Sequence, residues 1–187
     1  AGVSGVTMRA MLDACVLYPT VMREVLMGCA AVGLFEPRWS DRILEEWARA
    51  AAKLGPGEEV VARGEVAALV AAWPGATVPV AHGLAERLWL PDPNDIHVLA
   101  AAIGGSCDLI VTMNAKDFPR DILAEEGLMR VDPDGFLLGL RETDPAKVDR
   151  VIDGVVATAT RLSGESWDAR RLMKKARLNR LGKAHGR

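Results

Sequence analysis

The sequence predicts an α/β protein, an α/β/α sandwich around a central parallel sheet with a helical extension at its C-terminal end. Short apolar runs at residues 8–12, 108–112 and 128–131 alternate with longer segments in which apolar residues recur every three or four positions. This alternation of strand-like and helix-like patterns is typical of a parallel sheet covered by helices. Within the middle run, Leu109, Ile110 and Val111 are consecutive. Such a run is expected of a strand that is buried on both faces.

The helices are delimited by residues that favour helix starts and ends. Pro19 suits a first turn, Ser40 is a candidate N-cap, and Gly33 follows a helix end. From these signals and the apolar spacing we expect helices at residues 19–31, 40–51, 58–72, 95–103, 133–140, 145–163 and 165–181. Residues 77–80 are expected to form an edge strand, because Pro79 cannot donate a hydrogen bond to a neighbouring strand.

Size and composition set broad limits on the class of protein. The 187 residues are half hydrophobic, which allows a sizeable core, and we divide them into a main domain at 8–140 and a helical extension at 141–187. No apolar stretch approaches the roughly 18 residues that span a bilayer, so we expect no membrane association. The three cysteines lack zinc-ligand spacing and are expected to be free thiols in the cytoplasm. Residues 1–7 do not resemble a signal peptide, and Met8 is the expected natural start.

Acidic and amide residues stand where predicted strands end and helices begin. Asp13 follows the first strand, Asn114 and Asp117 follow the strand at 108–112, and Asp92 and Asp95 precede an Ala-rich helix. The carboxyl ends of parallel strands meet at one edge of a sheet, where ligands bind. Carboxylates crowded there repel one another unless a cation lies between them. We therefore predict a site for Mg²⁺ or Mn²⁺, which prefer oxygen ligands, and metal-assisted hydrolysis of phosphodiesters.

Other readings of these residues are open at this level. Asp13 and Asp95 could each be a simple helix cap, and Asn114 a turn residue. Glu45 and Glu46 are adjacent in a predicted helix, so only one of them can face the sheet edge. Thr112 could hydrogen-bond a phosphate or a metal-bound water. The chain has no G-x-x-x-x-G-K-[ST] or G-x-S-x-G motif, which disfavours an NTPase or an acyl-transfer enzyme.

Charge is distributed unevenly along the chain. Residues 161–187 carry a local charge of +7, whereas the remainder carries −9. A basic tail indicates an anionic partner such as nucleic acid, although it could also be a solvated helix face or fold back on its own acidic body. If the partner is RNA, we expect the basic residues of the last helix to contact phosphates rather than bases. They are Arg170, Arg171, Lys174, Lys175 and Arg177.

Four segments in order resemble the PIN domain. They are Leu12-Asp13-Ala14-Cys15-Val16-Leu17, Trp39-Ser40 with Ile43-Leu44-Glu45-Glu46, Leu90-Pro91-Asp92-Pro93-Asn94-Asp95 with Val98-Leu99-Ala100-Ala101-Ala102, and Ile110-Val111-Thr112-Met113-Asn114-Ala115-Lys116-Asp117-Phe118. The resemblance extends over about residues 9–140. Within this superfamily the chain is similar to VapC-type toxins of bacterial toxin–antitoxin pairs, in particular to the subgroup with an extra C-terminal helical segment.

The resemblance implies a Mg²⁺- or Mn²⁺-dependent endoribonuclease that cleaves structured RNA, such as tRNA or rRNA. It also implies a VapB-like antitoxin as partner and makes a homo-oligomer an expectation. By position, Asp13, Asp95 and Asp117 match metal-binding acidic residues, and Glu46 matches a catalytic glutamate, with Glu45 as its fallback. Thr112, Asn114 and Asp92 would support the site. Asn114 stands where many family members have Asp, which removes one carboxylate and leaves the number of metal ions open.

Two other functions remain open at this level. The first is a PIN-like module that binds RNA or a protein partner without cleaving, which the Asn114 departure motivates. The second is a phosphatase or phosphoacceptor that uses Asp13 as nucleophile. This second reading is disfavoured, because Cys15 stands where a second Asp is expected.

Overall fold

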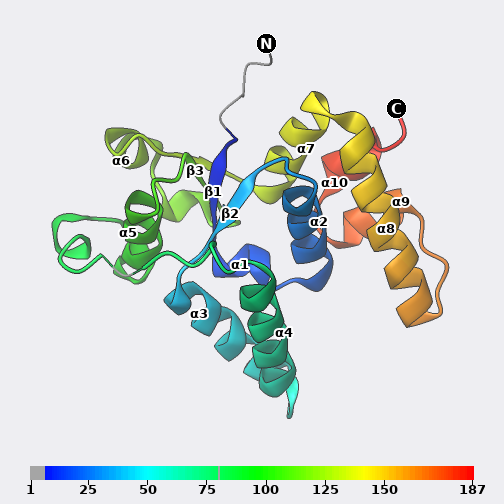
Figure 1. The fold of residues 1–187 in the computed structure, drawn as a ribbon, viewed down its shortest axis with the longest axis horizontal. Coiled ribbons are helices and arrows are strands. Elements are labelled where there is room, and N and C mark those ends of the chain that lie inside the picture. Colours follow the sequence, from blue (N-terminus) through cyan, green and yellow to red (C-terminus); the bar gives the residue numbers. More distant parts are fainter. Residues whose placement is uncertain (1–6, 80) are drawn as a thin grey trace.

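A four-stranded parallel sheet forms the centre of the computed structural model, which describes residues 7–79 and 81–187 (Figure 1). The strand order is β2-β1-β3-β4, and all neighbouring strands pair in parallel. Their bounds are β1 Arg9–Leu12, β2 Glu36–Arg38, β3 Leu109–Val111 and β4 Met129–Val131. Met11 pairs with Arg38 on one side and with Ile110 on the other. The predicted α/β/α class with a central parallel sheet is therefore confirmed.

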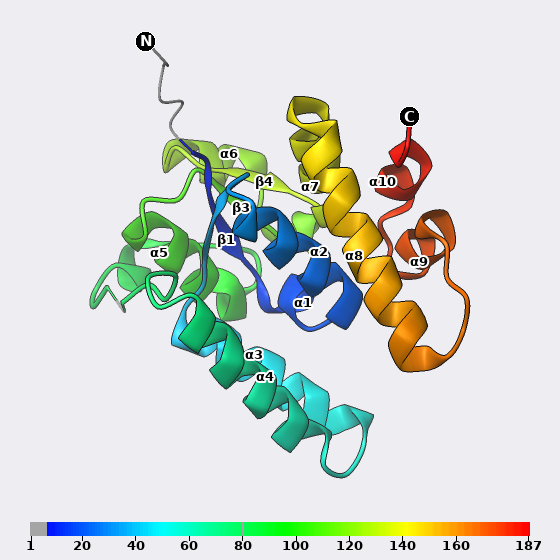
Figure 2. The same cartoon turned by 45° about the vertical axis from the view of Figure 1, so that its right-hand side comes forward.

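Helices cover the two sides of this sheet (Figure 2). Helices α5 and α6 lie on one side, while α1, α2 and α8 lie on the other. The bounds are α1 Ala14–Leu17, α2 Thr20–Ala31, α3 Asp41–Ala51, α4 Glu58–Ala72, α5 Ile96–Gly104, α6 Arg120–Glu125, α7 Pro133–Thr143, α8 Pro145–Ser163, α9 Ala169–Lys175 and α10 Asn179–Ala184, with 3-10 turns η1 Ala52–Leu54, η2 Ala85–Arg87, η3 Pro93–Asp95 and η4 Ala115–Asp117. In the part of the chain that the structure describes, no helix combines the length and apolar character that a membrane crossing requires.

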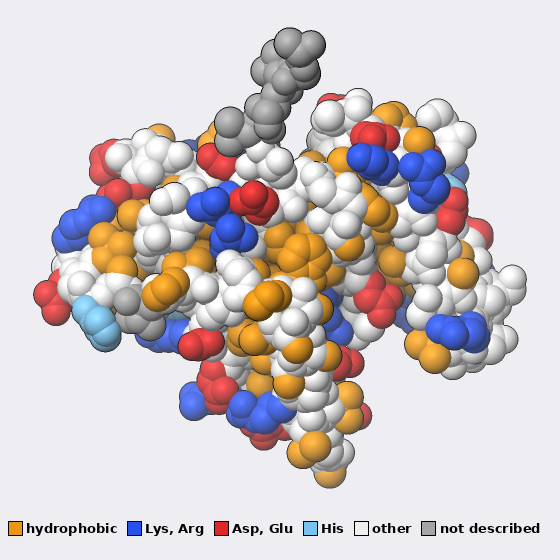
Figure 3. Space-filling view, in the orientation of Figure 1, with side chains coloured by type: hydrophobic (Ala, Val, Ile, Leu, Met, Phe, Trp, Pro, Cys, Tyr) orange, Lys and Arg blue, Asp and Glu red, His pale blue; other side chains and the backbone are white. Residues whose placement is uncertain are grey.

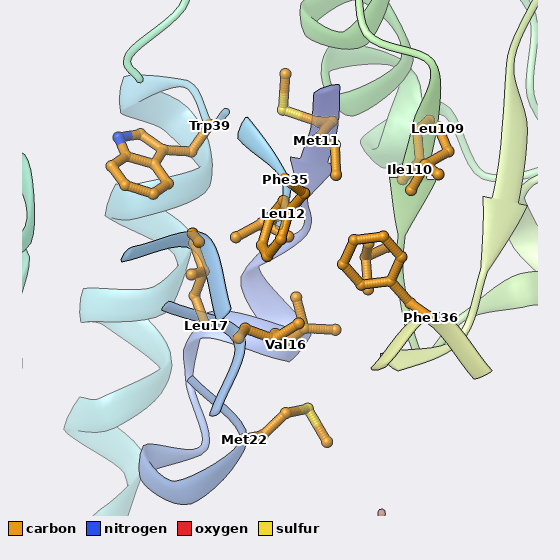
Figure 4. Close-up of a cluster of buried hydrophobic side chains, with 14 of the residues drawn as sticks. Met11, Leu12, Val16, Leu17, Met22, Phe35, Trp39, Leu109, Ile110 and Phe136 are labelled. Carbon is orange, nitrogen blue, oxygen red and sulfur yellow. The ribbon is translucent and has the colours of Figure 1, made fainter. Parts of the chain in front are cut away.

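One part of the core lies between the sheet and the helices on the α2 side. The cluster also fills the opposite side, since Met11 and Leu12 are consecutive in β1 and face opposite sides of the sheet; both are fully buried, as is Ile110 of β3 (Figure 4). The rings of Phe35 and Phe136 meet edge to face, with centroids 4.9 Å apart. Aromatic pairs in this arrangement contribute about 1 kcal/mol beyond their buried area. The same cluster extends into the C-terminal helices through Leu172, Met173, Leu178 and Leu181.

Two sequence predictions differ from the observed fold. The predicted edge strand at 77–80 is only a single bridge between Thr77 and Trp39. Its last residue, Val80, lies outside the described residues, as do residues 1–6, which precede the expected start at Met8. The edge strand on this side of the sheet is β2, which contains Pro37, a residue tolerated at a sheet edge. The single helix predicted at 165–181 is two short helices, because the chain turns at Arg177.

Candidate active site

A pocket of about 650 Å³ lies at the carboxyl edge of the sheet. Asp13 reaches it from the end of β1, Asn114 from the segment after β3, Glu46 from α3, and Asp95 from the turn before α5. Residues more than 80 positions apart in the sequence thus meet at one site. These four of the predicted acidic and amide residues line one pocket.

Asp13 caps a helix and lines the pocket at the same time. One carboxylate oxygen accepts a hydrogen bond from the backbone N–H of Ala14 at 2.8 Å, which starts α1. The other accepts one from the Thr112 hydroxyl, also at 2.8 Å. Thr112 in turn accepts from the backbone N–H of Asn114 at 3.0 Å. Burial raises the pKa of Asp13 above its ordinary value, and these hydrogen bonds oppose that rise only in part.

Asp95 is free of local capping, unlike its neighbour Asp92. The Asp92 carboxylate accepts from the backbone N–H of Asn94 at 2.9 Å, whereas Asp95 stands at the start of α5 without a side-chain cap hydrogen bond. Partial burial raises the pKa of Asp95 to about 6, and the negative charges of Asp13, Asp92, Asp117 and Glu46 add to the rise. Asp117 does not line the pocket but acts on it electrostatically from η4.

The two adjacent glutamates of α3 have different surroundings. Glu45 accepts hydrogen bonds from Arg49 at 2.9 Å and from Arg63 of α4 at 2.8 Å, which lower its pKa to about 2. Figure 3 shows acidic and basic side chains side by side along this α3–α4 hairpin. Glu46 instead lines the pocket. The geometry therefore favours Glu46 over its fallback as the glutamate of the site.

His97 is a site neighbour that the sequence did not reveal. It lies in α5, two positions after Asp95. Its Nε2 atom is 2.6 Å from a carboxylate oxygen of Glu46, and its side chain is mostly buried. The contact lacks hydrogen-bond geometry, so neither ring nitrogen has a hydrogen-bond partner among the described residues. His97 therefore approaches Glu46 of α3 from α5 without lining the pocket itself.

The five basic residues predicted to bind RNA divide into two groups. Lys175 and Arg177 line the same pocket as the acidic residues. Arg170 lines a separate depression beside Lys183, while Arg171 stacks on the ring of Trp167 at 5.0 Å. Lys174 is exposed and does not line the acidic pocket. Two of the five thus lie close enough to the acidic residues to act on the same bound molecule.

The acidic residues of the pocket supply only some of the ligands that a hard divalent cation needs. Among the residues that the structure describes, no group of three or more His, Cys, Asp or Glu side chains is arranged to hold a metal ion. Mg²⁺, however, usually takes one or two carboxylates, keeps several waters and draws further oxygens from substrate phosphates. Asp13 and Asp95 supply two carboxylates whose charges destabilise one another. They therefore fit an ion that is completed by water and substrate rather than a closed protein cage.

The repulsion at Asp95 predicts a pH-dependent gain in stability for Asp95→Asn. The pKa of Asp95 in the folded protein, about 6, lies above the ordinary value of 3.8, so the charged carboxylate destabilises the fold fully above about pH 6. This destabilisation is lost below about pH 3.8, where the carboxyl group is protonated in both the folded and the unfolded protein. In EDTA at pH 8 we expect Asp95→Asn to be more stable than the parent by about 1 kcal/mol, after discounting for solvent screening. Urea unfolding at pH 8 and pH 4 measures this gain. Equal gains at both pH values would contradict it.

Comparisons with known proteins agree on the family. The family profile described as PIN domain matches residues 9–116. Over 62 residues the chain is 40% identical to "Putative ribonuclease VapC50" of Mycobacterium tuberculosis H37Rv. The matched segment covers 33% of this chain and 37% of that protein. The match thus spans little more than a third of this relative's length. No solved structure matches the chain significantly.

Proposed function

Because the chain belongs to the PIN domain family, we propose that it is a metal-dependent endoribonuclease and the toxin of a toxin–antitoxin pair. The observation that carries the proposal is the pocket that Asp13, Glu46 and Asp95 share with Lys175 and Arg177. Acidic side chains suit a cation, and basic side chains beside them suit the phosphates of an RNA strand. The ribonuclease name of the similar mycobacterial protein supports the same substrate class.

The acidic and polar residues in and beside the pocket have different roles in the proposed hydrolysis. Asp13 and Asp95, with Asp117 nearby, would hold Mg²⁺ or Mn²⁺, which when bound lowers the pKa of a water and neutralises charge on the phosphate. Glu46 accepts the proton of the attacking water. Thr112 fixes the orientation of the Asp13 carboxylate through its hydroxyl. Asn114 offers an amide oxygen to a water or to the substrate.

The wider biological assignment follows from the same proposal. We place the nuclease domain at residues 8–140 and the helical extension at 141–187. The substrate is structured RNA, tRNA or rRNA, the inhibitor is a VapB-like antitoxin, and the site of action is the cytoplasm, where a homo-oligomer can form. Expression of the protein is expected to arrest growth, and co-expression of a neighbouring small reading frame is expected to relieve the arrest. Unimpaired growth of cells that contain folded protein would argue against a toxin.

Paired substitutions in α3 test the enzymatic part of the proposal. We expect Glu46→Gln to slow cleavage of total RNA in Mn²⁺ by about 30-fold, because the amide cannot accept the proton. Glu45→Gln, one residue away on the ion-paired side of α3, is expected to change the rate less than twofold. Gel electrophoresis of the RNA over time measures both rates. Equal rates for the two variants would remove Glu46 from the mechanism.

One alternative function retains specific support. Asn114 supplies no carboxylate, and the described residues form no metal-holding group of three acidic, Cys or His side chains. Both observations favour a PIN-like module that binds RNA or a protein without cleaving it. Incubation of the parent protein with total RNA distinguishes the two functions. Cleavage that requires Mn²⁺ and stops in EDTA supports the enzyme, whereas RNA that is bound but intact supports the module.

A further inference from the structure

The chain ends α9 with a turn that normally requires glycine. The backbone N–H of Leu178 donates to the carbonyl of Met173 at 2.8 Å, and that of Arg177 donates to the carbonyl of Lys174 at 3.1 Å. This pair of hydrogen bonds is the Schellman motif, in which the residue after the C-cap takes a left-handed conformation. That residue is Arg177, with φ of 62°. A side chain at this position strains the backbone, whereas glycine adopts the conformation freely.

The surrounding packing holds this turn in place. Leu178 and Met173 are buried in the core, which supplies the hydrophobic contact that accompanies the motif. Helix α10 lies against α9 so closely that a Cβ atom on Gly182 would be 2.9 Å from the Cβ of Met173. The fold therefore fixes the backbone of Arg177 without any contribution from its side chain. Stability gives no reason for an arginine at this position.

The Arg177 side chain lines the acidic pocket. It is exposed, and no hydrogen bond or ion pair joins it to another described residue. Asp13, Glu46 and Asp95 line the same pocket, yet Arg177 forms no ion pair with any of them. A guanidinium with free donors at an acidic pocket is suited to an anion that bridges the two charges. The planar donor fork of Arg matches the oxygens of a phosphate.

We propose that Arg177 binds a backbone phosphate of the RNA across the pocket from the acidic residues, and that its strained conformation is retained for this contact. Strained residues persist where the surrounding structure over-determines them, and they cluster at functional sites. The inference deepens the proposed ribonuclease function and rests on it for the identity of the anion. It also makes the end of α9 part of the substrate-binding surface.

Three substitutions at one position separate charge from strain. All are made in the full chain with Asp13→Asn, so that RNA is bound without being cleaved. We expect Arg177→Gly and Arg177→Ala to weaken binding of bulk tRNA by about tenfold, and Arg177→Lys to weaken it less. The slope of log K against log salt should flatten by about 0.7 when this single contact is lost. Thermal unfolding of Arg177→Gly should occur at the same or a higher temperature than that of the parent, and above that of Arg177→Ala.

The matched control is Arg170→Ala, which removes a basic residue of α9 that lines a different depression. Its loss of tRNA affinity, measured by fluorescence anisotropy, should be smaller than that of Arg177→Ala. Equal losses for the two residues, unchanged binding by Arg177→Gly, or a clear fall in its unfolding temperature would overturn the inference. If the parent protein, which retains Asp13, binds RNA without cleaving it, the ribonuclease proposal is removed. The assignment of Arg177 then stays intact.

Discussion

Asp13→Asn is expected to abolish RNA cleavage, with a loss of at least about 1000-fold, without lowering the stability of the fold. Among the described residues that line the pocket, Asp13 is the only acid that directly follows a buried strand, and it is 4% exposed. Removing its charge removes a ligand for the cation that stabilises the developing charge on the phosphate. The amide has the same shape, and its oxygen can still accept from the backbone N–H of Ala14. The hydroxyl of Thr112 can rotate to accept from the amide nitrogen.

Stability and activity should therefore move independently at this position. Burial raises the pKa of Asp13, so the folded protein disfavours the charge that the site needs. In EDTA at pH 7 we expect Asp13→Asn to unfold at the same temperature as the parent or higher. Added Mn²⁺ should raise the unfolding temperature of the parent but not that of the variant. More than a tenth of the parental cleavage rate in the variant, or an equal response to Mn²⁺, would remove Asp13 from the site.

The strands that could be predicted from the sequence are those with apolar runs. β1 and β3 were predicted because burial leaves a continuous apolar signature, whereas the apolar Met129 that marked β4 is exposed. β2 was missed, because Glu36, Pro37 and Arg38 form no such run. β2 pairs with β1, and the side chains of Arg9 and Glu36 form an ion pair of 3.1 Å between the two strands. This contact joins distant segments, so local sequence patterns do not reveal it. The break after α9 was missed for a related reason, since no Gly or Pro marks it and tertiary packing holds Arg177 in the turn.

The candidate site could be predicted where topology alone places a residue. Asp13 follows β1 and Asp95 precedes α5, so a parallel sheet brings both to one edge whatever their rotamers. The choice between the adjacent glutamates of α3 needed the structure, because it depends on Arg63 of another helix. The contact of His97 with Glu46 likewise joins two helices and leaves no trace in local spacing. Residue types and topology fix where the site lies, while contacts between elements fix which side chains face it.

Asp134→Ala is expected to lower the free energy of unfolding by about 3 kcal/mol, although the residue looks like an ordinary first-turn acid of α7. Its buried carboxylate accepts from the backbone N–H groups of Arg180 and Leu181, each at 3.0 Å. These groups begin α10, whose own N-cap residue, Leu178, supplies no side-chain hydrogen bond. Asp134 thus caps α10 from a different helix, and its removal leaves two donors without partners in a largely buried place.

The control for Asp134→Ala is Arg180→Ala, which removes the long Arg180–Asp134 contact of 3.4 Å but keeps both backbone hydrogen bonds. Its cost should stay below about 1 kcal/mol, because the Arg180 side chain is exposed and the Asp134 carboxylate keeps its two backbone donors. Urea unfolding gives both values, and amide hydrogen exchange should be faster at Leu181 in Asp134→Ala alone. Equal costs would show that the ion pair, not the cap, anchors α10.

Because α10 packs directly on α9, loss of this cap should also loosen Lys175 and Arg177 and reduce RNA cleavage. An acid remote from the pocket would then control the basic side of the site through the helix that it caps.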